Sequence, residues 1–225
     1  MTDEERQQKT EAESDAEWLL LLLLLYVGRP DTPKRVTFKL GRFYVDDVSV
    51  SINRIRSFVL RTERRLSRRV GQLVDDLDSG KIDADAWEKE FNRNITSGHI
   101  IAGALALGGI AKAIDNRIVR RRLDIERKYA ERFAGQIRRG EAGSPQAIRS
   151  RSRSYLRSIS ITYGQVELAT QRALGFRKEC RRIRRASESC RGCRRWSYRW
   201  MPIEQMPPIG TLDCGGNCRC YLEYR

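Results

Sequence analysis

Five cysteines in two clusters near the C-terminus constrain this chain more than any other feature. The first cluster is Cys190-x₂-Cys193, and the second is Cys214-x₃-Cys218-x-Cys220. The surrounding segment is rich in turn-forming residues and poor in aliphatic ones. A module of about 50 residues with this composition rarely folds without a metal, disulfides or a partner. We therefore expect the thiols either to bind a metal or to form crosslinks.

The spacing of the two clusters favours zinc. Four thiolates hold zinc tetrahedrally, and a Cys-x₂-Cys turn followed by a second pair about 20 residues later is typical of structural zinc sites. Cys180, upstream of both clusters, is expected to be a spare thiol. A disulfide within one cluster and reduced thiols without metal are the alternatives. The predicted ligands of a structural Zn²⁺ are Cys190, Cys193, Cys214 and Cys218, with Cys220 as the alternative fourth ligand.

The charge of the chain points to a polyanionic partner. The formal net charge is +15, and basic proteins of this kind commonly contact nucleic acid or acidic surfaces. Solvated helix faces are the alternative explanation. Trp196 and Trp200, which lie among the arginines, are expected to form a small core over the metal. The arginines predicted to contact a polyanion or an acidic surface are Arg181, Arg182, Arg184, Arg185, Arg194, Arg195 and Arg199.

A run of leucines lies near the N-terminus. The apolar run is ten residues long and is too short to cross a bilayer, which needs about 20 apolar residues, so no membrane contact is expected. No secretory signal is apparent because the chain starts with acidic residues, and the cysteines are expected to meet a reducing cytosol. A run of exposed leucines is unfavourable in water unless a partner buries it. The residues predicted to dock into a partner are Trp18, Leu19, Leu20, Leu21, Leu22, Leu23, Leu24 and Leu25.

Hydrophobic periodicity predicts a mainly α fold. We expect a bundle of about four long helices, a short N-terminal β arm and a small Cys-rich C-terminal module. Alternating β-branched and aromatic residues over 36–46 predict a hairpin. Apolar steps of three and four residues, with capping residues and glycines at the ends, predict the helices. The helices are expected to start at Ser51, at Asp83 or Asp85, near residue 113, and at Ser144-Pro145. The predicted domains are 1–48, 49–175 and 176–225.

Catalysis has little support in the sequence. His99 is the only histidine, and its apolar flank predicts a packed side chain. The sequence contains no HExxH motif, no Gly-x-Ser-x-Gly elbow and no phosphate-binding glycine loop. We therefore predict that the chain is not an enzyme; a toxin-type enzyme would have to depend on His99.

The residues around the cysteine clusters resemble a known family. The tail contains Cys190-Arg-Gly-Cys193, then Trp200-Met-Pro-Ile and Pro207-Pro-Ile-Gly, and it ends in Cys214-Gly-Gly-Asn-Cys218-Arg-Cys220-Tyr-Leu-Glu-Tyr. It resembles the C-terminal end of phage minor head (head morphogenesis) proteins of the Mu F-like group, which carry an Asn-Cys-Arg-Cys-type signature after an upstream Cys-x₂-Cys. The segments Gly41–Asp46 and Asp83–Trp87 are similar to members of the group in a weaker way. Longer members of the group carry an appended toxin or enzyme domain, which we do not expect in this chain.

The resemblance implies a setting more than a reaction. It implies a non-enzymatic structural protein of the virion head, present in the host cytoplasm during assembly and acting in head assembly near the portal. The implied partners are the portal protein, the major capsid protein and packaged DNA, within an oligomeric assembly. The alternative is a zinc-containing DNA-binding module that acts in packaging or regulation.

Overall fold

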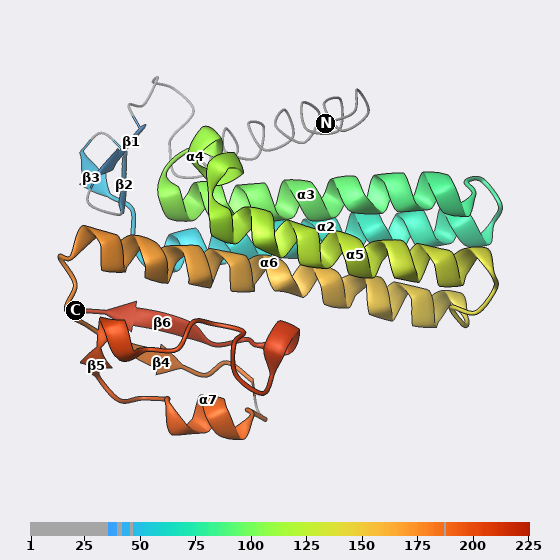
Figure 1. The fold of residues 1–225 in the computed structure, drawn as a ribbon. Coiled ribbons are helices and arrows are strands. Elements are labelled where there is room, and N and C mark those ends of the chain that lie inside the picture. The colour runs from blue at the N-terminus through green and yellow to red at the C-terminus, as the bar shows by residue number, and fades with distance from the viewer. Residues whose placement is uncertain (1–35, 40–41, 46, 187) are drawn as a thin grey trace.

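The computed structural model describes residues 36–39, 42–45, 47–186 and 188–225. These residues are mainly helical, and the four long helices run side by side as a bundle (Figure 1). The predicted fold class is therefore confirmed. The predicted docking segment, Trp18 and Leu19–Leu25, lies outside the described residues. The long helices are α2 (Ile52–Asp78), α3 (Ala84–Leu107), α5 (Arg117–Arg138) and α6 (Pro145–Leu174), and the short helix α4 spans Ile110–Asp115.

Side-chain caps set the starts of the helices close to where the sequence predicts them. The Ser144 side chain accepts a hydrogen bond from the backbone N–H of Ala147, and Pro145 occupies the first turn of α6. The predicted third helix is divided in two, which the periodicity did not indicate. Asn116 has an extended backbone, and its side-chain oxygen accepts from the N–H groups of Ile118 and Val119. It therefore begins a new helix after α4.

Small residues allow α3 to pack closely in the middle of the bundle. A Cβ at Gly98 would lie 2.3 Å from Ile159 Cδ1 and 3.0 Å from Leu66 Cδ1, and a Cβ at Gly103 would lie 2.6 Å from Val119 Cγ2. The two glycines thus bring α3 against α2, α5 and α6. Among the helices of the described residues, none combines the length and hydrophobicity needed to cross a membrane.

The predicted hairpin is present as a small antiparallel sheet at one end of the bundle (Figure 1). Its strands are β1 (Val36–Lys39), β2 (Arg42–Val45) and β3 (Val48–Ser49). The rings of Phe38 and Phe43 meet edge to face at 4.9 Å between centroids, and Phe43 is buried. This aromatic pair attaches the sheet to the end of the helical core.

The C-terminal module lies along α6 (Figure 1). Its antiparallel sheet has the strand order β5-β4-β6, and a five-residue helix, α7, lies beside it. Ile161 and Leu168 of α6 belong to the same buried cluster as Met206 and Leu222 of the module. A module of this size has little core of its own, so α6 supplies the missing side. The elements are β4 (Glu179–Ile183), α7 (Arg191–Arg195), β5 (Met201–Pro202) and β6 (Tyr221–Tyr224).

Close backbone contacts fix the module on α6. A Cβ at Gly210, whose φ is 78°, would lie 2.6 Å from Ile161 Cγ2. Arg172, near the end of α6, donates through Nη2 to the carbonyl oxygens of Ile203 at 3.0 Å and Met206 at 2.8 Å. These contacts hold the 203–210 segment, which precedes the second cysteine cluster, against the helical body.

Candidate metal centre

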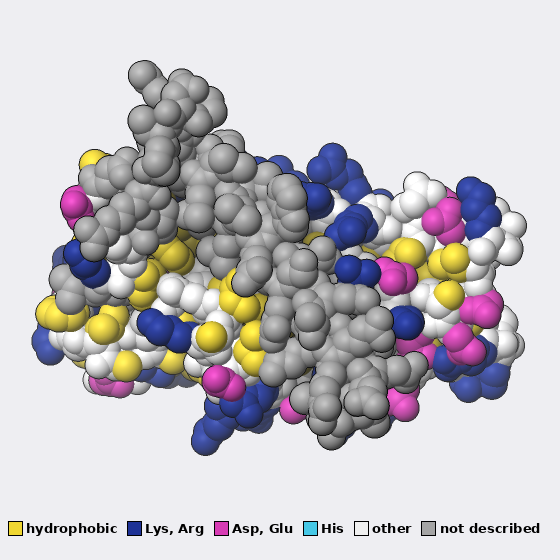
Figure 2. All heavy atoms as spheres, turned by 90° about the horizontal axis from the view of Figure 1, so that it is seen from above, with side chains coloured by type: hydrophobic (Ala, Val, Ile, Leu, Met, Phe, Trp, Pro, Cys, Tyr) yellow, Lys and Arg dark blue, Asp and Glu magenta, His cyan; other side chains and the backbone are white. Residues whose placement is uncertain are grey.

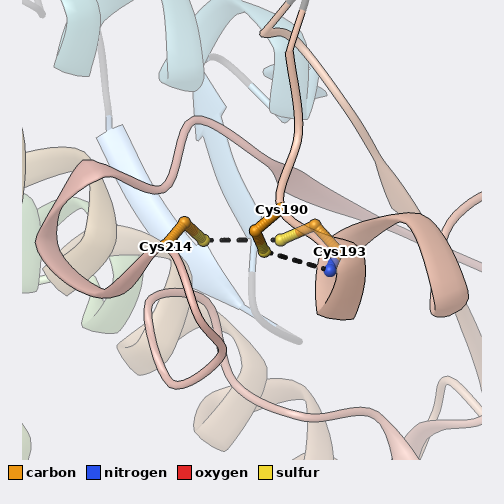
Figure 3. A group of neighbouring side chains, drawn as sticks. All are labelled: Cys190, Cys193 and Cys214. Carbon is orange, nitrogen blue, oxygen red and sulfur yellow. Dashed lines mark hydrogen bonds between the residues drawn. The ribbon is translucent and has the colours of Figure 1, made fainter.

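Three thiols converge where α7 begins. Cys190 caps α7, and its Sγ accepts a hydrogen bond from the backbone N–H of Cys193 at 3.2 Å. Cys214 approaches from the loop before a turn of 3-10 helix at Gly215–Asn217. Figure 3 shows Cys190, Cys193 and Cys214 pointing toward one another from these two segments. The Cys-x₂-Cys turn thus places both of its sulfurs on the side that faces the second cluster.

The distances between the sulfurs suit a tetrahedral thiolate site. Cys193 Sγ lies 3.5 Å from Cys214 Sγ and 4.0 Å from Cys218 Sγ. Zinc–sulfur bonds of about 2.3 Å in a tetrahedron place the sulfurs about 3.8 Å apart. Two groups of three thiols have all their sulfurs within 4.8 Å, namely Cys190, Cys193 and Cys214, and Cys193, Cys218 and Cys220. The cluster could therefore hold a metal ion, with Cys193 common to both groups.

Cys218 and Cys220 lie in the cluster of thiols, whereas Cys180 lies outside it. Cys218 Sγ lies 4.0 Å from Cys193 Sγ, and Cys218 and Cys220 both group with Cys193 but not with Cys190 and Cys214. Hydrogen bonding from Cys220 lowers the pKa of Cys218 to about 4. Cys180 is fully buried in the module core, outside both groups, and burial raises its pKa to about 11. All six cysteines are free thiols in this structure.

Neighbouring groups connect the two halves of the centre. Asp213 Oδ2 accepts a hydrogen bond from the backbone N–H of Gly192 at 3.0 Å, which joins the loop before Cys214 to the turn of the first cluster. A Cβ at Gly192 would lie 3.1 Å from the Leu212 side chain. Glycine between the two cysteines of the first cluster therefore lets the two segments approach closely.

Arg182 is a correction to the sequence prediction. It was expected to contact an external polyanion, but it is 0% exposed. Its Nη1 lies 3.7 Å from Cys193 Sγ and 4.0 Å from Cys218 Sγ, and its Nη2 donates to the carbonyl oxygens of Pro207 and Pro208. A buried guanidinium beside thiolates offsets negative charge, so Arg182 supports the cysteine cluster from within.

The other predicted contact arginines have different surroundings. Arg181 pairs with Glu223 at 2.7 Å, and Arg184 lies over the ring of Tyr198. The remaining four are solvent-exposed and stay candidates for an external contact. They are Arg185, Arg194, Arg195 and Arg199.

The expectation that Trp196 and Trp200 form a core over the metal is wrong. Both are only partly buried, and neither belongs to the buried cluster of the module. Arg181 and Arg225 lie over the Trp200 ring, at 4.8 and 4.5 Å from its centroid. Aliphatic side chains fill the core instead, because the strand alternation of β4 and β6 directs Cys180 and Leu222 inward.

His99 is a packed side chain, as the sequence predicts. It is fully buried, with Nδ1 2.7 Å from Thr162 Oγ1 and Nε2 3.2 Å from Ser158 Oγ. Burial, with smaller effects of Arg122 and Arg127, lowers the pKa of His99 to about 3. The imidazole is therefore neutral at physiological pH and has no contact with solvent.

Sequence reasoning missed a buried polar network between the module and the bundle. Arg56 of α2 pairs through Nη2 with Glu167 of α6 at 3.3 Å and donates to the carbonyl oxygen of Leu222 in β6. The hydroxyls of Tyr163 and Tyr224 donate to Glu167 at 2.9 and 3.4 Å. Burial raises the pKa of Glu167, and Arg56 opposes that effect. These residues are far apart in the sequence, and no local pattern relates them.

Comparison with models of known protein families, with curated proteins and with solved structures found no match to this chain.

Proposed function

We propose that this chain is a non-enzymatic structural protein in which one zinc ion holds together the C-terminal module that packs on a helical bundle. The convergence of the cysteines around Cys193 Sγ carries this proposal. Zinc suits four thiolates in a tetrahedron and has no redox chemistry of its own, so a site closed by four protein ligands serves structure. The bound ion would supply folding free energy to a module that has a small core of its own.

Three of the proposed ligands, Cys190, Cys193 and Cys214, form one group of thiols. Cys218 Sγ lies 4.0 Å from Cys193 Sγ and belongs, with Cys220, to the second group. We propose Cys218 as the fourth ligand, with Cys220 as the alternative. Four thiolates and one Zn²⁺ leave two negative charges in a partly buried site, and the Arg182 guanidinium at 3.7 to 4.0 Å from two of the sulfurs offsets part of that charge.

The setting that we propose is the assembly of a phage head. The likeness of the tail to minor head proteins of the Mu F-like group supports this setting. Such a protein would pack against the portal or the major capsid protein through its helical body and through the leucines at 19–25. Its excess of positive charge suits a position beside packaged DNA or an acidic capsid lining. The expected location is the virion head, after assembly in the host cytoplasm.

Mass spectrometry of purified phage particles tests this setting directly. The proposal expects the chain in particles that have been washed in about 1 M salt, because contacts made through apolar side chains resist screening. A second sample from particles that lack DNA should contain the same amount of the chain. Absence from both kinds of particle would contradict the proposal.

A second candidate is a zinc-containing DNA-binding module that acts in packaging or regulation. The exposed Arg194, Arg195 and Arg199 beside the cysteine centre favour it. Binding of this kind should weaken steeply as salt rises, because each phosphate contact releases counterions. Binding through phosphate contacts is typically lost between roughly 50 and 200 mM salt. If the association of this chain with phage heads is lost over the same salt range, this candidate is favoured over a structural role.

A further inference from the structure

Six arginines of the protein line one cavity. On the face seen in Figure 2, the basic and acidic side chains of the described residues are interspersed. By contrast, a cavity of about 490 Å³ between α2, α6 and the segment Cys218–Tyr221 is lined by six arginines and two glutamates. The arginines are Arg56, Arg64, Arg153, Arg157, Arg185 and Arg219, and the glutamates are Glu63 and Glu167.

The two glutamates already have partners. Glu167 accepts hydrogen bonds from Arg56 and from the Tyr163 hydroxyl. Glu63 Oε2 accepts from Ser160 Oγ at 2.8 Å, and burial raises the pKa of Glu63. Arg56 therefore neutralises Glu167. Glu63 alone cannot balance the charge of the five remaining arginines. The cavity has an excess of positive charge.

Arg56 has donors that the surrounding protein does not satisfy. Its side chain is only 5% exposed, and Nη2 makes the contacts to Glu167 and Leu222. No acceptor among the described residues pairs with its Nε or Nη1. Buried donors without acceptors are unfavourable and uncommon in folded proteins. These two nitrogens are shielded from solvent, and the guanidinium lies over the Tyr221 ring at 4.7 Å from its centroid, so Arg56 contributes positive charge to the cavity wall and no accessible donor.

Four further arginines line the cavity. Arg153 and Arg157 lie one turn apart on α6, about 6 Å along the helix axis. Arg64 comes from α2 and Arg219 from the loop between Cys218 and Cys220. All four are exposed, and none forms an ion pair within 4.0 Å with an acid in the described ranges. Three of them, Arg64, Arg157 and Arg219, lie near enough to Glu63 to oppose the rise in its pKa, but one carboxyl group cannot neutralise all four. A cluster of exposed guanidinium groups suits several successive anionic groups better than a single small anion.

The tyrosines of the cavity are not available for stacking on a base. Arg56 and Arg185 both lie over the Tyr221 ring, at 4.7 and 4.9 Å from its centroid. Tyr163 is buried, and its hydroxyl is bonded to Glu167. Nucleic-acid sites that hold bases use free aromatic faces. This cavity instead presents guanidinium groups, which bind phosphate without regard to sequence.

We propose that the cavity between α2, α6 and Cys218–Tyr221 binds consecutive phosphate groups of a nucleic-acid strand without base preference. This site adjoins the proposed zinc site, since Cys218 and Cys220 line the cavity, and phosphate binding goes beyond the structural function. It also differs from the arginine surface that the sequence predicts, with which it shares only Arg185.

Fluorescence anisotropy of a labelled 12-nucleotide oligodeoxythymidylate tests this proposal on the full chain. Arg153→Gln combined with Arg157→Gln should weaken binding at least 10-fold at low salt. The slope of log K against the logarithm of the salt concentration should become shallower by about 1.4. Each phosphate contact on a single strand contributes about 0.7 to this slope, and the variant loses two contacts. The matched control, Lys128→Gln with Arg132→Gln on α5, removes the same charge at the same spacing outside the cavity and should weaken binding less than 2-fold. All four side chains are exposed, so both double variants should unfold like the wild type.

Three outcomes would overturn the proposal. The first is wild-type protein that does not bind the strand. The second is equal weakening by the two double variants, which would mean that overall charge and not the cavity governs binding. The third is binding of poly-glutamate of equal charge with the same affinity and the same dependence on Arg153 and Arg157, since that site would take acidic polypeptide.

Discussion

At the scale of single residues, Arg182 shows how the cysteine cluster depends on a neighbour that is not a ligand. Its guanidinium is fully buried between Cys193, Cys218 and the carbonyl oxygens of Pro207 and Pro208. A run of arginines in the sequence gives no sign that one member points inward. The register of β4 against β6, which pairs Arg182 with Leu222, places this one side chain on the core side.

Replacing Arg182 should weaken metal binding. Arg182→Gln removes the positive charge beside two sulfurs, and loss of such a neighbour lowers metal affinity by about 10–100-fold. Competition with a chromogenic chelator measures this affinity. Arg194→Gln, at an exposed position of α7, is the control and should bind the metal like the wild type. Equal affinities for the two variants would show that Arg182 does not act on the metal.

His99 should make stability depend on pH. Its pKa is lowered from 6.5 to about 3, chiefly by burial and then by Arg122 and Arg127, so the unfolded chain takes up a proton that the folded chain excludes. The stabilisation is fully present above about pH 6.5 and is lost as pH falls toward 3. Between pH 7 and 5 the loss is about 2 kcal/mol. Urea unfolding of the wild type and of His99→Gln at both pH values measures it.

The comparison with His99→Gln is needed because buried glutamates oppose the loss of stability at low pH. Burial raises the pKa values of Glu63, Glu126 and Glu167, which favours the folded state as pH falls. The quantity to compare is therefore the difference between the two proteins. If that difference is the same at pH 7 and pH 5, His99 does not contribute as described.

At the scale of helices, the packing of α3 depends on positions without a side chain. Ile159 and Leu66 occupy the space that a Cβ at Gly98 would need. Gly71 in the interior of α2 is different, because the nearest atom to its Cβ would be Arg153 Nη2 at 4.0 Å. Both glycines lie inside long helices of the bundle, but only at Gly98 would a Cβ collide with neighbouring side chains. Gly71 therefore serves as the control for Gly98.

Gly98→Ala should destabilise the protein by about 1–3 kcal/mol, because the added methyl group overpacks the core. Gly71→Ala should be neutral or stabilising by up to about 1 kcal/mol, since alanine favours helix. Chemical denaturation of both variants gives the two free energies of unfolding. The packing described here is wrong if Gly98→Ala is as stable as Gly71→Ala.

The helices could be predicted from the sequence because their signals are local. Apolar steps of three and four residues, Ser51 and Ser144 as caps, and glycines at the ends lie within each segment. The division at Asn116 was missed because the apolar pattern continues across it. The contact of Arg56 with Glu167 could not be predicted, since it joins residues that only the packing of α2 on α6 brings together.

At the scale of the whole molecule, the cysteine centre and the bundle stabilise each other. The two clusters were recognisable from spacing alone, but the surface on which the module rests was not. Ile161 and Leu168 of α6 complete the module core, and Arg172 holds its loop through backbone carbonyl groups. A module with only a small core of its own thus depends on the helix beside it and, in our proposal, also on the bound metal.

Metal content tests the central claim most directly. The wild type, Cys193→Ala and Cys180→Ala, purified under reducing conditions, are compared by elemental analysis. We expect one equivalent of zinc in the wild type and in Cys180→Ala, and no zinc in Cys193→Ala, because Cys193 belongs to both thiol groups and Cys180 to neither. Two results together would contradict the account. The first is that the wild type carries no metal after reconstitution with zinc. The second is that added zinc does not change how fast a protease cleaves residues 176–225.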